Sequence, residues 1–349
     1  MLNHYFFTSV TRISDLEETP FEITRLPFSD WQAGDYVSTM TQDISGRLRN
    51  IELPNGRMAE IAEGEHLIGA LGVRAATLEA VGSWASAGED LSLDLMTPAG
   101  LIGKITSKSP FLRSPVSLDY IGHVTRAGKK IQMTDFVATT DTAATSGSNA
   151  FSLPIILIIG TSMSAGKTTS ARTIVRLLKQ AGYRVIGAKL TGAARYRDVL
   201  SLGDAGADII YDFNDAGLAS SICPAEQYRT ALRQLLARMA TEQADVLVAE
   251  AGASPLEPYN GLTAVEEVGN NVCFTLLCAS DPYAVAGVSS AFECEPDLVA
   301  GGAANTSAGI ELVEKLTGIK ALNLLEKSSI PLLSKMIINK IENWQRPEV

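Results

Sequence analysis

An apolar run that leads directly into a glycine-bounded loop is the feature that most restricts the fold of this chain. Residues 154–159 are PIILII, and residues 160–169 are GTSMSAGKTT. A short continuous apolar run is typical of a parallel strand that is buried on both faces. Residues 167–181 then place several apolar side chains on one helical face, namely Ala171, Ile174, Val175 and Leu178. The order of strand, loop and helix predicts a phosphate-binding loop at the carboxyl end of a buried strand.

Each residue type in the loop has a use in holding a phosphate group. We expect the loop as a whole to bind phosphate oxygens, largely through backbone N–H groups, with contributions from Gly160, Thr161, Ser162, Met163, Ser164, Ala165, Gly166, Lys167, Thr168 and Thr169. Lys167 is expected to reach the β- and γ-phosphates, and the Thr168 hydroxyl is expected to bind Mg²⁺. Five residues separate Gly160 from Gly166, where the common motif has four.

Strands and helices alternate through the rest of the chain. Apolar strand patterns occupy residues 184–189, 245–249, 272–278, 297–299 and 319–322, and helical patterns occupy residues 224–241, 282–291, 306–316 and 330–344. This alternation predicts an α/β fold with a doubly wound, mostly parallel sheet. Ligands of such sheets bind beyond the carboxyl ends of the strands. The residues at those ends are therefore the candidates for a functional site.

The chain before residue 138 alternates apolar and polar residues with a period of two, which is typical of strands. Hairpins are expected there at 91–106 and at 118–137, and one short helix is expected at 73–81. These patterns predict a smaller, β-rich domain, for which a barrel is one open topology. The small polar residues that follow predict a linker. The predicted division is a β-rich domain at 1–137, a linker at 138–152 and the α/β domain at 153–349.

Composition narrows the choice of partners and surroundings. The formal net charge is −10, so we expect no nucleic-acid partner. The four cysteines and three histidines lie in different halves of the chain without CxxC spacing, which argues against a structural zinc site. The first residues do not resemble a secretion signal, and the most apolar run is too short to cross a bilayer. We therefore expect a cytoplasmic protein that works without a membrane.

Two charged residues that end apolar strands complete the predicted catalytic set with Lys167. Lys189 closes the run VIGAKL, where an ammonium group can neutralise charge on a transferred phosphoryl group. A surface lysine with a buried stem would give the same pattern. Glu250 closes the run VLVAE, where a carboxylate is expected to bind Mg²⁺ directly or through water.

The loops that follow these strands supply further candidates. Among the acidic residues after the second strand, Asp208 is a candidate metal ligand and Asp212 a candidate substrate-binding residue, with a solvated helix face as the alternative. Asn305 lies between a strand end and a helix start, where capping the helix would explain an asparagine. A candidate substrate loop, whose guanidinium groups would hold a carboxylate or phosphate or else face solvent, consists of Thr191, Gly192, Arg195 and Arg197.

The loop GTSMSAGKTT resembles the GT-x4-GKT loop of dethiobiotin synthetase and its relatives in the SIMIBI class of P-loop NTPases. The segments GYRVIGAKLTG, ADVLVAEAG and PDLVAGGAANTSAGIELVEKLTG resemble the DUF1611 family, some of whose members are described as D-amino acid N-acetyltransferases. Together these resemblances cover residues 155–325. They imply that Lys189 contacts the substrate near the γ-phosphate, that Glu250 is associated with the metal, that Asn305 lies near the nucleotide base, and that a homodimer is one mode of assembly. Ala251 stands where relatives usually carry glycine.

These features favour an ATP-dependent enzyme that acts on a small molecule. Such a kinase or ligase would transfer the γ-phosphoryl group of Mg·ATP to a carboxylate, carbamate or hydroxyl acceptor. ATP is favoured over GTP because Asn339-Lys340 lacks the aspartate that completes a guanine-reading motif. One alternative is a switch or chaperone that hydrolyses a nucleotide to control a protein partner. The other is an N-acetyltransferase of the DUF1611 type that uses acetyl-CoA.

Overall fold

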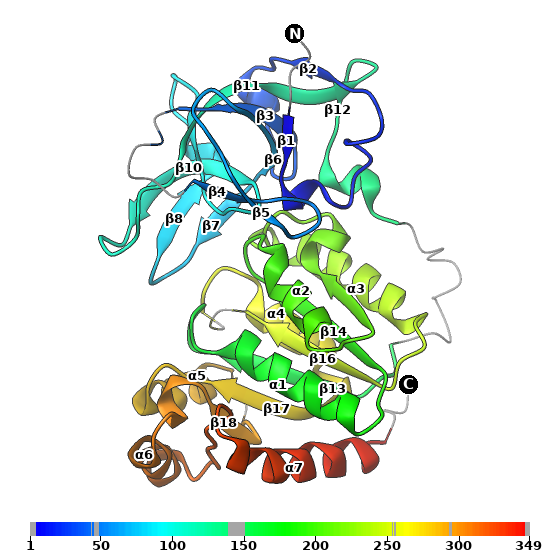
Figure 1. Ribbon diagram of the computed structural model, residues 1–349, viewed down its shortest axis with the longest axis vertical. Helices are drawn as coiled ribbons and strands as arrows, with labels where there is room; N and C mark the ends of the chain where they lie inside the picture. Colours follow the sequence, from blue (N-terminus) through cyan, green and yellow to red (C-terminus); the bar gives the residue numbers. More distant parts are fainter. Residues whose placement is uncertain are drawn as a thin grey trace. The chain divides into compact units, whose positions relative to one another are not determined.

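The computed structural model describes residues 5–42, 44, 49–138, 151–252, 254, 256–292 and 295–345. These residues form two compact units, whose elements are labelled in Figure 1. The first unit contains the described part of Met1–Ala138 together with Ala193–Arg197 and Phe213–Ile222, and the second unit contains the remainder. Most of the predicted linker, residues 139–150, lies outside the described residues.

Two short segments depart from the division expected from the sequence, which assigned them to the α/β domain. They are Ala193–Arg197 and Phe213–Ile222, and they pack with the first unit. The segments also pair with each other, since Ala193 forms a β-bridge with Ser220 and a backbone hydrogen bond of 3.1 Å joins the neighbouring residues. Sequence patterns do not reveal this assignment because both segments follow strands of the second unit.

The first unit is built from short strands, most of them antiparallel. Its strands are β1 (Tyr5–Phe7), β2 (Glu22–Thr24), β3 (Tyr36–Thr41), β4 (Asn50–Glu52), β5 (Met58–Glu60), β6 (His66–Leu71), β7 (Val73–Ala75), β8 (Ala80–Ser83), β9 (Ser92–Leu95), β10 (Leu101–Lys108), β11 (Ser117–Arg126) and β12 (Lys129–Lys130). The main sheet has the order β1-β6-β3-β11-β9-β10-β8-β7, and β6 also pairs with β10. This extra pairing closes β6, β3, β11, β9 and β10 into a ring, which makes the unit a small barrel.

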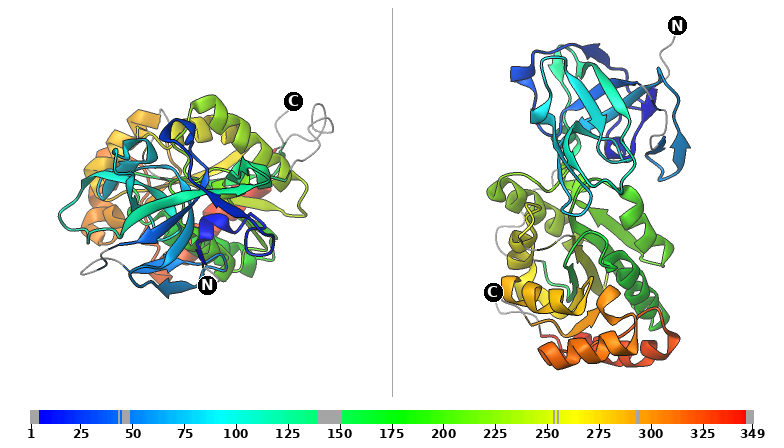
Figure 2. Two further views of the ribbon diagram at one scale, coloured as in Figure 1. Left: turned by 90° about the horizontal axis from the view of Figure 1, so that it is seen from above. Right: turned by 90° about the vertical axis from the view of Figure 1, so that its left-hand side faces the viewer.

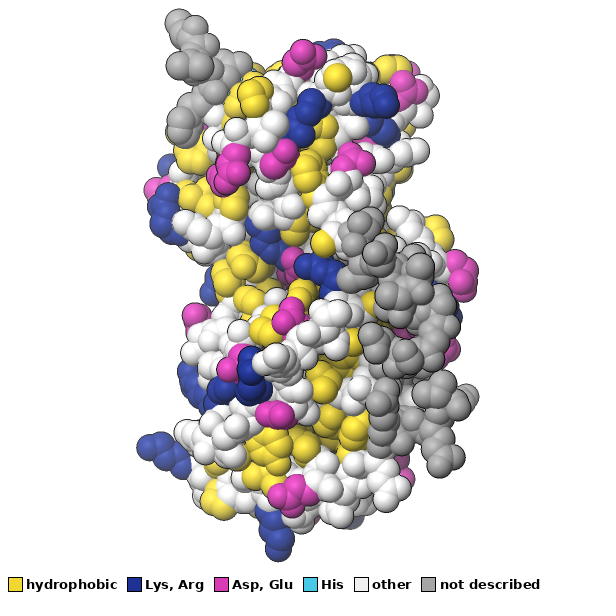
Figure 3. All heavy atoms as spheres, turned by 90° about the vertical axis from the view of Figure 1, so that its right-hand side faces the viewer, with side chains coloured by type: hydrophobic (Ala, Val, Ile, Leu, Met, Phe, Trp, Pro, Cys, Tyr) yellow, Lys and Arg dark blue, Asp and Glu magenta, His cyan; other side chains and the backbone are white. Residues whose placement is uncertain are grey.

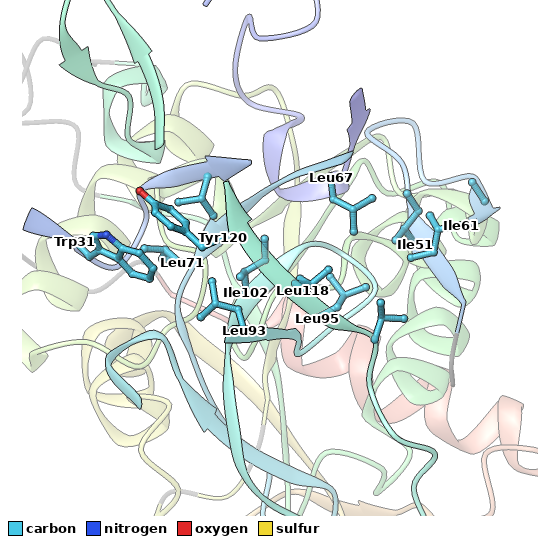
Figure 4. Packing of buried hydrophobic residues seen from close by; sticks show 13 residues of the cluster. Trp31, Ile51, Ile61, Leu67, Leu71, Leu93, Leu95, Ile102, Leu118 and Tyr120 are labelled. Atoms are coloured by element: carbon cyan, nitrogen blue, oxygen red, sulfur yellow. The ribbon is translucent and has the colours of Figure 1, made fainter. Parts of the chain in front are cut away.

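Apolar side chains from the ring strands fill the core of this unit (Figure 4). Leu67, Leu93 and Leu118 are fully buried, and each comes from a different strand. Trp31 packs against Tyr120 with ring centroids 4.3 Å apart. Burying one such side chain stabilises the fold by about 1.5–3 kcal/mol. The period-two pattern of the sequence is thus the alternation between this core and the outer face.

The structure bears out the first predicted hairpin and corrects two other predictions for this unit. β9 and β10 pair antiparallel, with Ile102 opposite Leu95. In the second hairpin the first strand and the turn are as expected, but the return strand is only the short β12, because residues 133–136 form a 3-10 helix. The predicted helix at 73–81 is wrong: β7 and β8 pair there as strands. The turn between the two strands spans residues 77–79.

The second unit contains one parallel sheet of six strands. The strands are β13 (Ile155–Gly160), β14 (Val185–Thr191), β15 (Ile209–Asp212), β16 (Val246–Ala251), β17 (Val272–Cys278) and β18 (Leu298–Ala300). Their order is β15-β14-β16-β13-β17-β18, and every pairing is parallel. The predicted α/β class is therefore confirmed. The predicted strand at 319–322 is reduced to one bridge between Ala321 and Val299.

Helices cover both faces of this sheet, as Figures 1 and 2 show. They are α1 (Lys167–Gln180), α2 (Tyr196–Asp204), α3 (Ala225–Ala240), α4 (Gly261–Val268), α5 (Pro282–Phe292), α6 (Ser307–Thr317) and α7 (Ile330–Glu342). α1 packs on the central strands with α7 beside it, while α4 packs on the opposite face against α3. The buried positions of β13 are apolar throughout because both of its faces are covered in this way.

The surface shows mixed charge. On the face seen in Figure 3, basic side chains of the described residues are scattered among acidic ones. None of the helices in the described part of the chain combines the length and the hydropathy that crossing a bilayer requires.

Candidate functional site

Two glycines shape the loop between β13 and α1. Gly166 immediately precedes α1 and has a φ of +101°, a left-handed conformation that other residues rarely adopt. Gly301 follows β18, and a Cβ atom at this position would lie 2.2 Å from the carbonyl oxygen of Ala165. The loop can therefore turn sharply into α1, and the segment after β18 can pack against it.

Lys167 is the first residue of α1 and runs back over the end of β13. Its exposed fraction is only 2%. A Cβ atom on Gly160 would lie 2.8 Å from Lys167 Cδ and 3.0 Å from Nζ, so glycine leaves the room that this side chain occupies. The ammonium group donates a hydrogen bond of 2.5 Å to the Ser162 carbonyl oxygen inside the loop. Burial lowers the pKa of Lys167, and the Glu250 carboxylate opposes that shift.

Thr168 and Glu250 are joined across two elements. The Thr168 hydroxyl lies 3.0 Å from Glu250 Oε2, to which it donates. Glu250 is buried on β16, next to Ile158 of β13. Over the residues that the structure describes, no three His, Cys, Asp or Glu side chains are grouped to hold a metal ion. Because Mg²⁺ usually binds through one or two protein groups, water and substrate phosphates, this pair suits a metal that arrives with a nucleotide.

Three charged residues lie in one row across the sheet. Asp212 of β15 is in register with Lys189 of β14, which is in register with Glu250 of β16. All three are buried. Burial would lower the pKa of Lys189, but the Asp198, Glu250 and Asp212 carboxylates outweigh it and raise the pKa. A lysine that stays charged therefore lies beside the pair of Thr168 and Glu250.

Asp198 belongs to this cluster, although sequence reasoning missed it. It lies in the first turn of α2, and its Oδ2 accepts a short hydrogen bond from Lys189 Nζ. An aspartate near the start of a helix is commonly placed by the helix dipole alone, so its position carries no distinctive signal. The usable signal was indirect, because a buried lysine needs an anionic partner.

The segment after β17 borders the same loop. The Thr161 N–H donates to the carbonyl oxygen of the last residue of β17 at 3.1 Å, and the Ser280 N–H donates to Thr161 Oγ1 at 3.1 Å. Asp281 caps α5, because its Oδ1 accepts two backbone N–H groups of the first turn at 3.0 and 3.1 Å. Cys278 is buried below this segment, and burial raises its pKa to about 11, which leaves the thiol protonated at neutral pH.

Asn305 follows β18 and is exposed. It does not cap α6: Thr306 does, with its side-chain oxygen accepting the Gly309 N–H at 3.1 Å. The carbonyl oxygen of Asn305 accepts a hydrogen bond from Asn323 Nδ2 at 3.2 Å. Of the two roles considered for Asn305, the helix cap is therefore wrong, and base reading stays a prediction.

The predicted substrate loop is divided between the two units. Thr191 and Gly192 belong to the second unit, whereas Arg195 and Arg197 belong to the first and have exposed side chains. Thr191 is buried at the carboxyl end of β14, and its hydroxyl donates to the Gly252 carbonyl oxygen at 3.2 Å. Substrate binding by these residues stays a prediction.

Asp208 lies at the wrong edge of the sheet for a metal ligand. It precedes β15, and its Oδ2 accepts the backbone N–H of Val185, the first residue of β14, at 2.7 Å. It also pairs with Lys179 at the end of α1. These contacts place Asp208 at the amino edge, whereas Thr168 and Glu250 lie at the carboxyl edge. The row of charged residues contains Asp212 instead, which lies four residues later at the other end of β15.

The other loop residues differ in how they are placed. Ser162 and Ala165 are buried, whereas the Ser164 side chain is exposed and Met163 is partly exposed. Thr169 is exposed and borders a groove of about 470 Å³ beside α1, which Arg172 and Leu324 also line.

No protein-family model matches the chain, and a search of curated proteins finds no significant match. A search of solved structures finds partial likenesses. HypB from Helicobacter pylori, solved in complex with nickel, is 18% identical over 56% of this chain and 91% of its own, with a TM-score of 0.37. Chloroplast FtsY from Physcomitrella patens is 16% identical over 60% of this chain and 70% of its own, with a TM-score of 0.38.

A third match is the 54 kDa signal recognition particle protein from Aeropyrum pernix, solved in complex with GDP. It is 17% identical over 60% of this chain and 52% of its own, with a TM-score of 0.34. These likenesses transfer no activity to this chain. The resemblances to dethiobiotin synthetase and to the DUF1611 family stay predictions.

Proposed function

We propose that the second unit binds a magnesium nucleoside triphosphate and transfers its γ-phosphoryl group. The observation that carries this proposal is the placement of Lys167. The side chain is buried in a loop that opens at the carboxyl edge of a parallel sheet, and Gly160 leaves the space it fills. A lysine in this position, at the start of a helix, is the arrangement with which proteins hold a β- or γ-phosphate.

The surrounding residues divide the work of binding. The Ser162 carbonyl oxygen accepts a hydrogen bond from the Lys167 ammonium group, and a phosphate oxygen would bind to the same group. Thr168, with Glu250 behind it, would hold Mg²⁺. When bound there, the metal would neutralise negative charge on the phosphate groups. The backbone N–H groups at the start of α1 favour the phosphate through the helix dipole.

Lys189 is the residue placed to act during the transfer itself. Its raised pKa keeps it charged at neutral pH, and its strand neighbour Glu250 lies next to Thr168. In the transfer, the bond from the γ-phosphorus to the β–γ bridging oxygen breaks and a bond to the acceptor oxygen forms. With water as acceptor, the proton that water loses passes to the released phosphate; a hydroxyl acceptor would lose its proton to solvent, and an ionised carboxylate or carbamate has none to lose. A fixed cation at this point stabilises the spread negative charge.

The proposal extends to ATP as the nucleotide and to a small molecule with a carboxylate, carbamate or hydroxyl group as the acceptor. The groove beside Thr169 adjoins the loop and has the volume for a nucleoside. Arg172 supplies a positive charge to it. The residues proposed for this kinase or ligase activity come from one chain, so the activity would be the same in a monomer and in a homodimer.

A nucleotide-driven switch is a second candidate, and one specific observation favours it. The first residues of α2, Tyr196 and Arg197, belong to the first unit, while the rest of that helix belongs to the second. A nucleotide that alters the pairing of Asp198 with Lys189 would therefore act on a helix shared by both units.

Thermal shift with ATP, GTP and acetyl-CoA, each with and without Mg²⁺, tests the proposal. We expect a nucleotide to raise the melting temperature in a magnesium-dependent way. Lys167→Met should abolish this increase. Lys179→Met is the matched control, because it removes a lysine of the same helix at the opposite edge of the sheet. Phosphate release with and without candidate acceptors then separates an enzyme from a switch. A shift with acetyl-CoA alone, or no shift with any nucleotide, would refute phosphoryl transfer.

A further inference from the structure

Glu52 is a buried carboxylate of the first unit that the proposed chemistry does not use. It is the last residue of β4 and is 1% exposed. Its Oε1 accepts the Arg197 N–H at 2.7 Å, and its Oε2 accepts the Tyr196 N–H at 2.8 Å and the Ser9 hydroxyl at 2.6 Å. All of these residues belong to the first unit.

The amides that Glu52 binds are those at which α2 begins. Tyr196 and Arg197 are the first two residues of the helix, so their N–H groups have no partner within it. A carboxylate at this end also interacts favourably with the helix dipole. The next residue is Asp198, whose carboxylate pairs with Lys189. The first turn of α2 therefore donates backbone hydrogen bonds to Glu52 and, through Asp198, accepts a hydrogen bond from Lys189.

We propose that Glu52 is a positioning residue for phosphoryl transfer, acting through Asp198 on Lys189. The inference rests on the function proposed above. α2 contains nine residues, a length at which a helix has little stability of its own, so its first turn depends on contacts such as this cap. Without the cap, the start of α2 should be less ordered and the hydrogen bond between Asp198 and Lys189 weaker. The loop that binds the nucleotide keeps its own hydrogen bonds, so binding should change much less than turnover.

A double-mutant cycle on the full chain tests this coupling. Glu52→Gln and Asp198→Asn are made singly and together, and kcat and KM are measured for hydrolysis of whichever nucleotide stabilises the wild type. We expect each single change to lower kcat about tenfold with KM within about twofold. The double variant should lie within about twofold of Asp198→Asn alone, since both changes remove the same effect.

Two exposed carboxylates provide matched controls. Glu60→Gln alters the strand that pairs with β4, and Asp204→Asn alters the far end of α2. Both should leave kcat unchanged. Glu52→Asp retains the charge and should recover part of the loss, which also covers the case in which Glu52→Gln unfolds the protein.

Additive losses in the cycle, or a fall in kcat with Glu60→Gln as large as with Glu52→Gln, would show that Glu52 has only a structural role. A larger effect on KM than on kcat would also overturn the inference. Failure of the proposed function would give a different result. The wild type would then neither bind nor hydrolyse a nucleotide, and Lys167→Met would be indistinguishable from the wild type. That result would overturn the inference together with the function on which it rests.

Discussion

Replacing Lys189 by methionine should destabilise the second unit strongly. It removes the positive charge that lies between the buried carboxylates of Asp212 and Glu250. The substitution keeps most of the volume of the side chain but leaves Asp212 and Glu250 buried, with Asp198 at the edge of the cluster. Removing one partner of a buried ion pair typically costs about 3–5 kcal/mol. We expect a loss in this range at pH 7. Asp198→Asn in the same chain should recover about 1 kcal/mol or more of it, because the negative charge that faced Lys189 is removed.

The pH dependence of this loss follows from the raised pKa of Lys189. A lysine whose pKa is higher in the folded state contributes stability that is fully present below its ordinary value of 10.5 and is lost as pH rises through the folded value. The difference between wild type and Lys189→Met should therefore be equal at pH 7 and pH 9. Urea denaturation followed by helical circular dichroism measures it, since the helices lie mostly in the second unit.

Lys179→Met is the control for this measurement. Lys179 pairs with Asp208, but both side chains are about 30% exposed, and such pairs contribute about 1 kcal/mol or less. A loss for Lys189→Met no larger than that of the control would refute the buried row as a charge-balanced cluster. A difference that shrinks between pH 7 and pH 9 would refute the assigned direction of the pKa shift.

Two further substitutions test single contacts. Gly160→Ala places a Cβ atom 2.8 Å from Lys167 Cδ, so it should weaken nucleotide affinity at least about tenfold, as measured by isothermal calorimetry. Circular dichroism should show that the fold is intact. Unchanged affinity would show that Lys167 does not need the space beside Gly160. Asp281→Ala removes the cap of α5 and should cost about 0.5–2 kcal/mol in urea denaturation, whereas Asp281→Asn should cost less. Equal losses for the two variants would contradict the cap.

The local parts of the site could be predicted from sequence. Gly160, Gly166 and Lys167 follow one buried strand directly, so their placement depends only on a strand, a turn and a helix start. Lys189 and Glu250 could be predicted because each ends an apolar run, and parallel strands end at the same edge. Sequence alone supplied the edge but not the register that puts the two side by side.

The parts that failed depend on contacts between distant segments. Asp208 and Asp212 are four residues apart, and the chain crosses the sheet between them, so one lies at each edge. Asp198 has the appearance of an ordinary surface residue of a helix until its partner Lys189 is known. The helix expected at 73–81 failed for a local reason instead, because β7 and β8 pair as adjacent strands within that stretch.

The division of the chain into units bears on how it is made. Residues 213–222 belong to the first unit, although they follow several strands and helices of the second in sequence. During synthesis, the barrel therefore gains its last segment only after β13, α1, β14 and β15 have left the ribosome. A chain stopped at residue 138 leaves Glu52 without its helix amides, and a chain begun at residue 153 leaves the start of α2 without its carboxylate. The two units should mature together, with neither complete before the other has begun to form.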